Sequence, residues 1–136
     1  MEEASLSRVV MLCLALAAAE TVHGMIRIAF VAPRLGEARA IKLAGVTGTL
    51  LAFALCWAFV PGIGLDTAAA HLGLGWVLAA FMAGFDLAVG RWLARKPWAQ
   101  IWRDFDPRTG NLLSYGLAAL TVIPLVVWFA QGGSAR

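Results

Sequence analysis

The stretch LALAAAETVHGMIRIAF, residues 14–30, places an acid, an imidazole and a guanidinium inside an otherwise apolar run. The three side chains are Glu20, His23 and Arg27. On a helix, His23 lies about 60° and Arg27 about 20° from Glu20, so all three share one face. A lone charge in the centre of a bilayer costs about 2.5–3.5 kcal/mol. We therefore predict a membrane helix whose polar face turns toward other protein.

The composition of the whole chain agrees with this interpretation. The 136 residues are 61% hydrophobic and only 14% charged, and the mean hydropathy is +0.79. Soluble domains have about 25% charged residues, so a soluble domain is disfavoured. No zinc-ligand spacing, P-loop or dinucleotide fingerprint occurs, and no metal or cofactor is expected. Cys13 and Cys56 both lie in apolar runs, where buried free thiols are expected.

Four apolar segments are long enough to cross a bilayer. The predicted fold is an all-α polytopic membrane protein, a single domain over 1–136, with four transmembrane helices in an antiparallel bundle. The helices are expected at about 6–32, 41–60, 72–94 and 111–130. Pro33, Pro61 and Pro97 fall at the segment ends, whereas Pro124 is expected to kink the fourth helix.

The first segment also has features of a cleaved signal peptide. VVMLCLALAAA has the length and character of a signal-peptide core. The preceding MEEASLSR carries two acids and one arginine, however, and apolar sequence resumes at once in MIRIAFVA. We therefore expect a retained helix.

Basic residues are distributed unevenly between the predicted loops. Of the eleven Lys and Arg residues, only Arg8 and Arg136 belong to the side of the termini. The other nine lie in or beside the first and third loops: Arg27, Arg34, Arg39, Lys42, Arg91, Arg95, Lys96, Arg103 and Arg108. Basic loops stay in the cytoplasm, so both termini are expected to be periplasmic or extracellular. The predicted localisation is the bacterial inner (plasma) membrane.

The third loop contains a short amphipathic pattern. Trp98, Ile101, Trp102 and Phe105 follow an i, i+3, i+4, i+7 spacing in KPWAQIWRDFDPRTG. We predict a helix over about 97–105 that lies on the inner membrane surface and contacts anionic lipid. An ordered connector packed on the bundle, or a surface for a partner, are the alternatives.

Polar residues of the other segments fall at the same depth as Glu20. We expect a polar cluster in the cytoplasmic half of the bundle, in which Arg27 is the expected ionic partner of one of the acids. The candidate ligand-binding or proton-relay residues are Glu20, His23, Arg27, Thr47, Asp86, Asn111, Ser114 and Tyr115. The cluster can be a structural ion-pair network, a solute or proton site, a catalytic site or a haem site. His71 is too far along its segment to join His23 in ligating haem.

A weak internal repeat relates the first and third segments. Glu20 is followed by Gly24 and Arg27, and Asp86 by Gly90 and Arg91. Two helical hairpins related by an axis along the membrane normal would produce this pattern. The third segment also carries small residues at four-residue spacing (Ala80, Gly84 and Ala88), which predict close helix packing.

Three stretches resemble an uncharacterised family of small four-helix bacterial inner-membrane proteins. They are the Glu-Thr-Val-His-Gly stretch within AETVHGMIRIAFVAPRLGEARAIKLAGVTGTLL, its APRLG-x-x-RA loop, and WRDFDPRTGNLL near residues 102–113. The resemblance spans most of the chain. It implies a four-helix membrane fold and supplies no activity, ligand or catalytic residue.

The expected function is that of a non-enzymatic membrane component, either an accessory subunit or a small-solute or proton transport-type protein. The alternative is a membrane enzyme that acts on a lipid or quinone headgroup at the inner interface. Membrane lipid is the expected partner, together with further copies of the chain or a larger membrane complex. Nucleic acid is not expected.

Overall fold

The structure is a computed structural model of the chain, and it describes residues 3–106, 108 and 113–132. Nearly all of these residues are helical, and none of the described residues forms a strand. The elements are α1 Glu3–Ile26, η1 Arg27–Val31, α2 Ala32–Leu35, α3 Glu37–Ile63, α4 Ala68–Ala88, η2 Val89–Leu93, α5 Trp98–Asp104 and α6 Leu113–Ala130. Here η denotes a π-helical segment.

Three of the helical stretches are long and apolar enough to cross a membrane. They are Leu6–Leu35, Glu37–Ile63 and Ala68–Leu93, and Ser114–Ala130 is a shorter apolar helix. The prediction of an all-helical protein with several apolar helices of membrane-spanning length is confirmed for the described residues.

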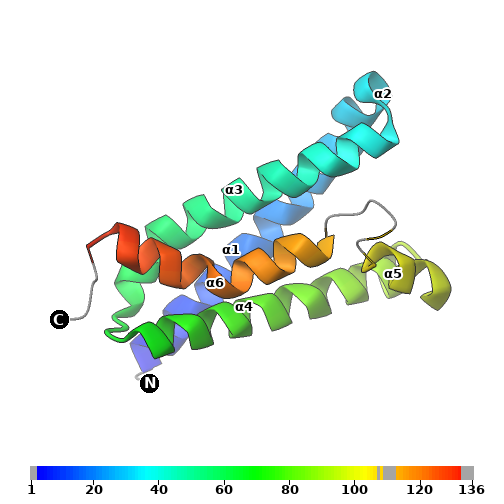
Figure 1. The fold of residues 1–136 in the computed structure, drawn as a ribbon. Helices are drawn as coiled ribbons and strands as arrows, with labels where there is room; N and C mark the ends of the chain where they lie inside the picture. Colours follow the sequence, from blue (N-terminus) through cyan, green and yellow to red (C-terminus); the bar gives the residue numbers. More distant parts are fainter. Residues whose placement is uncertain (1–2, 107, 109–112, 133–136) are drawn as a thin grey trace.

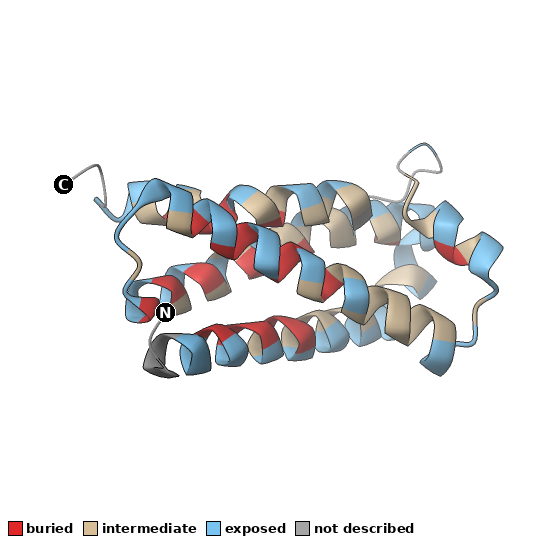
Figure 2. Cartoon of the chain, turned by 90° about the horizontal axis from the view of Figure 1, so that it is seen from below, coloured by how far each residue is buried: buried red, intermediate tan, exposed pale blue. Residues whose placement is uncertain are grey.

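The long helices pack side by side around one apolar core. α6 lies against both α3 and α4, α1 packs against α3, and α1 also contacts α4 (Figure 1). The start of α1 and the end of α6 lie at the same end of the molecule. Buried residues form stripes on the inward sides of the helices (Figure 2). Leu12, Leu16, Cys56, Leu78 and Val127 are among the side chains removed from the surface.

The chain turns between α2 and α3 at a single residue. Gly36 has φ +88°, a value that L side chains rarely adopt, and it both ends α2 and precedes α3. The expected loop around residues 33–40 is therefore wrong, because Pro33 lies at the start of α2 and Glu37 already begins α3. Proline needs no backbone N–H partner in the first turn of a helix, so Pro33 starts a helix here rather than ending one.

One more helix end differs from its expected position. Pro61 lies inside α3, which continues to Ile63 and ends at Gly64 in the left-handed conformation. A proline inside a helix leaves the carbonyl four residues before it without its helical partner, and here the carbonyl oxygen of Trp57 accepts a hydrogen bond from Gln131 Nε2 instead, at 3.1 Å. Arg8 of α1 donates a hydrogen bond to the carbonyl oxygen of Gly62 at the end of α3. The interfacial helix α5 occupies Trp98–Asp104, close to the expected 97–105, with Pro97 just before it.

The closest approach between helices occurs at Gly75 of α4. A Cβ atom there would overlap the carbonyl oxygen of Thr121 in α6 and lie 2.5 Å from its carbonyl carbon. Only a glycine allows the two backbones to come this close. The expected packing face at Ala80 and Gly84 is instead exposed, and a Cβ at Gly84 would meet no atom within 4 Å.

This contrast gives a matched pair of substitutions. Gly75→Ala forces α4 and α6 apart and should lower the free energy of unfolding by about 1–3 kcal/mol, the usual cost of overpacking. Gly84→Ala, in the same helix with open space around it, should be neutral or stabilise by up to about 1 kcal/mol. Unfolding of the purified protein in mixed micelles by SDS, followed by circular dichroism, measures both. Equal effects of the two substitutions would contradict the assigned packing.

Candidate functional site

A polar contact joins α1 and α3 in the middle of their apolar interface. His23 of α1 and Thr47 of α3 form a hydrogen bond, with 2.6 Å between Nε2 and Oγ1. Gly48 is buried beside them, and a Cβ there would lie 3.4 Å from Glu20 Oε2 and 3.6 Å from His23 Cε1. The missing side chain of Gly48 therefore leaves room for the Glu20 carboxylate and the His23 ring between the two helices.

The proton positions of this contact follow from the neighbouring bond of Thr47. Thr47 Oγ1 donates its one hydroxyl proton to the carbonyl oxygen of Leu43, at 3.0 Å, within its own helix. With that proton on the Leu43 carbonyl, we expect the hydroxyl to accept from His23, which predicts that Nε2 carries the ring proton. In this tautomer Nδ1 is an acceptor, and it has no hydrogen-bond partner among the described residues.

A second acid comes from α4. Asp86 lies close enough to Glu20 for the charges of the two carboxylates to interact, and both side chains are half-buried. The sequence-based expectation that one of them pairs with Arg27 is wrong for the residues that the structure describes. The salt bridges found among the described residues join other side chains, Lys96 to Asp104 and Arg108 to Asp106, each at 3.0 Å. Asp86 thus acts electrostatically on Glu20, and neither acid has a basic partner at ion-pair distance among the described residues.

The remaining candidate residues have different surroundings. Arg27 begins η1 and lies near enough to affect His23 electrostatically. Ser114 donates to the carbonyl oxygen of Phe105, so it ties the start of α6 to the end of α5. Tyr115 is 60% exposed, and Asn111 lies outside the described residues. The structure thus brings together Glu20, His23, Thr47 and Asp86, with Arg27 at the margin.

Both helices that carry an acid end in a π-helical segment. α1 continues into η1 seven residues after Glu20, and α4 continues into η2 three residues after Asp86. Such segments are rare and are frequent at functional sites. The weak sequence repeat predicted that the first and third apolar segments are related, and each of them contains one of these π-helical segments after its acid. The repeat itself stays a prediction.

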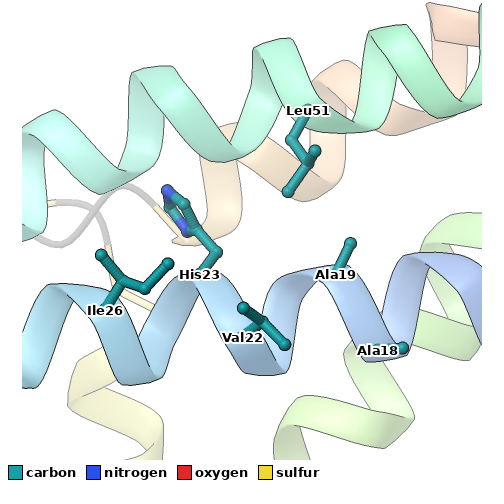
Figure 3. A pocket seen from close by; sticks show the side chains of 6 residues that line it. All are labelled: Ala18, Ala19, Val22, His23, Ile26 and Leu51. Carbon is teal, nitrogen blue, oxygen red and sulfur yellow. The ribbon is translucent and has the colours of Figure 1, made fainter.

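No sequence pattern indicates a groove beside His23. Between α1 and α3 an open hollow of about 470 Å³ is lined by His23 and otherwise by small or aliphatic side chains (Figure 3). These are Ala18, Ala19, Val22, Ile26 and Leu51. The five lining residues of α1 lie three or four positions apart, apart from adjacent pairs, and therefore share one face of the helix. The sequence predicts this common face, but it does not show that α3 leaves the face partly uncovered.

His71 lies far from this cluster along its helix. It is buried, with 1% exposed, near the start of α4, where Nδ1 is 2.7 Å from the carbonyl oxygen of Thr67. Its ring stacks on Trp128 near the end of α6, at 4.6 Å between centroids. A joint haem site with His23 is therefore excluded. Within the described ranges, no three His, Cys, Asp or Glu side chains are grouped so as to hold a metal ion.

The third connection forms a separate basic and aromatic element. Arg91 lies over the ring of Trp98 at 5.3 Å, Ile101 is buried, and Trp102 remains 64% exposed. The Arg108 guanidinium lowers the pKa of the Asp106 carboxyl by hydrogen bonding to it. Exposed indoles beside cations are typical of a membrane interface.

Comparison with known proteins identifies no relative: no family model, no curated protein and no solved structure matches the chain. The function must therefore be argued from the residues themselves.

The assigned tautomer of His23 is directly measurable. In ¹⁵N-histidine-labelled protein at neutral pH, the neutral His23 signal should show a protonated Nε2 and an unprotonated Nδ1. Thr47→Val should shift the Nε2 proton signal because its acceptor is lost. Thr49→Val is the control, since the Thr49 hydroxyl donates to Gly45 within its own helix. A protonated Nδ1 in the neutral ring would refute the assignment.

Proposed function

We propose that the chain is a four-helix membrane protein in which α6 forms the fourth span of an antiparallel bundle. The basic residues around α2 and α5 support a cytoplasmic position for these connections, and the shared end of α1 and α6 supports termini on the other side. The proposed location is the bacterial inner membrane, with α5 on its inner surface in contact with lipid.

We further propose that the cluster of Glu20, His23, Thr47 and Asp86 handles protons, as part of a small transport-type protein or an accessory subunit. The observation that carries this proposal is the proximity of Glu20 and Asp86 within apolar helices, without a basic partner at ion-pair distance in the described residues. Two carboxylates in a medium of low dielectric repel strongly when both are ionised. Such a pair holds a proton or attracts a cation.

The neighbours of the pair suit a proton rather than a metal ion. The Glu20 carboxylate and the His23 ring both lie next to Gly48, so a second titratable group is near the acids. Tight metal sites need more ligands than the cluster supplies, and metal binding by two carboxylates alone is weak. A proton needs only one acceptor at a time, and intramembrane acids with a histidine are a recurrent form of proton relay.

The proposal predicts the effect of neutralising each acid. Proteoliposomes with a pH-sensitive dye inside and an imposed potassium diffusion potential should show proton uptake with the wild-type protein. Glu20→Gln and Asp86→Asn should each reduce the rate at least about tenfold, equivalent to about 1.4 kcal/mol in the barrier. Glu37→Gln is the control, because Glu37 is exposed in the first turn of α3 and lies outside the cluster.

Thermal unfolding of the same variants separates function from structure. Loss of flux with unchanged melting temperature supports a proton path. Wild-type flux in both variants contradicts the proposal. A flux that falls only in proportion to the amount of folded protein assigns the cluster a structural role and also overturns it.

A further inference from the structure

The junction of η2 and α5, residues 89–105, presents indole side chains outward at the end of the molecule opposite the termini (Figure 1). α5 packs against η2 through Ile101, which is buried and lies 3.6 Å from the position of a Cβ at Gly90. The rings of Trp98 and Trp102 stack at 6.3 Å between centroids, yet they are 42% and 64% exposed. The short helix is therefore attached to the bundle and keeps two indoles accessible from outside.

The apolar part of α4 and η2 ends just before this junction. The stretch that is long and apolar enough to cross a membrane runs from Ala68 to Leu93, and Leu93 is 79% exposed. Its neighbour Trp92 is 69% exposed, and Arg95, two residues further on, is exposed as well. Residues this close to the end of a spanning helix lie at the level of the lipid headgroups, where indoles also gather.

The junction has more bases than acids, and its acids are already paired. Residues 91–108 contain five bases and two acids. The two ion pairs are Lys96–Asp104 and Arg108–Asp106. Arg91 and Arg95 have no carboxylate partner among the residues that the structure describes. Their two guanidinium groups are therefore available to an anion from outside the chain.

Arg95 adopts a backbone conformation that normally favours glycine. Its φ is +55°, and no other non-glycine residue in the described part of the chain has a positive φ. The turn around it is closed by the N–H of Lys96, which donates to the carbonyl oxygen of Gly90 at 2.9 Å. Glycine would occupy this position with less strain. A long cation in its place indicates that the guanidinium serves a contact rather than the turn itself.

An anionic phospholipid matches this combination of groups better than other occupants do. A guanidinium forms paired hydrogen bonds with phosphate oxygens. A zwitterionic headgroup brings an ammonium group as well, which unpaired arginines repel. An acidic protein segment would satisfy the arginines but would not account for Trp92 and Leu93, whose exposed apolar surface continues that of the spanning helix.

We propose that Arg95, together with Arg91 four residues before it, binds the phosphate group of an anionic phospholipid at the η2–α5 junction. Trp98 and Trp102 hold the junction at the depth of the headgroups. The inference rests on the proposed position of α5 at the membrane surface, to which it adds the class of lipid and the residues that select it. It does not involve the cluster around Glu20.

Quenching of tryptophan fluorescence by brominated lipid tests the selection. The full-length protein is reconstituted in bilayers of phosphatidylglycerol and phosphatidylethanolamine, with bromine on the acyl chains of only one of the two lipids. The signal of Trp102 is the difference between wild type and Trp102→Phe. Its quenching should show a preference for phosphatidylglycerol of about fivefold, the effect of one basic residue at a membrane surface. Trp76, 63% exposed in the first half of α4, is the control and should show no preference.

Arg95→Gly separates the guanidinium from the fold. Glycine relieves the positive φ, so the melting temperature should stay the same or rise, whereas the preference for phosphatidylglycerol at Trp102 should fall about fivefold. Arg39→Gln removes an exposed arginine of α3 outside the junction and should leave the preference unchanged.

The outcomes distinguish this inference from the proposed membrane position of α5. Equal quenching of Trp102 by the two brominated lipids overturns the selection but leaves α5 at the bilayer surface. A preference that survives Arg95→Gly, or one that is lost together with a lower melting temperature, overturns the role of Arg95. If neither lipid quenches Trp102, the position of α5 is itself wrong and the junction belongs to a partner in water. None of these results depends on the proton-flux measurement.

Discussion

The hydrogen bond from His23 to Thr47 is the contact on which the proposed site depends. It joins the imidazole to α3 and, because Thr47 donates to Leu43, it predicts the tautomer. Both the ring and the Glu20 carboxylate lie next to Gly48, where the missing side chain leaves them room. One bond between two apolar helices thus sets the position of the ring. Polar bonds of this kind contribute modestly to helix association in membranes, about 0.6 kcal/mol on average, so orientation is their larger effect.

Glycines determine how near the helices come to one another. At Gly75 the absence of a side chain brings α4 against the α6 backbone, and at Gly48 it creates room for polar atoms instead. The two positions show that a small residue in a membrane helix has no fixed meaning. It permits either backbone contact or a polar pocket, and the partner across the interface decides between them. Gly84 belongs to a four-residue spacing of small residues in the sequence, but it lies at neither a backbone contact nor a polar pocket, since a Cβ there would meet no atom within 4 Å.

The features that were predictable from sequence depend on local chemistry. The length of the apolar runs predicts the long helices, and the spacing of Trp98, Ile101 and Trp102 predicts α5. Helical geometry predicts that Glu20 and His23 share one face of their helix. The errors involve tertiary context. Pro61 lies inside α3, where Gln131, which follows α6, donates to the Trp57 carbonyl that the proline leaves free. Arg27 is not an ion-pair partner of either acid in the described residues. The groove was not predictable at all, because it depends on which face of α1 is left uncovered by α3.

Carboxylates inside a membrane bundle lower its stability unless their neighbours compensate for the loss of water. In soluble proteins, replacing a buried charged network by apolar residues of similar size is often neutral or stabilising. Glu20 and Asp86 have less compensation than such a network, since they interact with each other rather than with a base. A purely structural role would be served as well by two leucines or by an acid and an amide. The chain instead places two proton acceptors and a histidine in one region of the bundle, and this is the arrangement on which the proposed proton function rests.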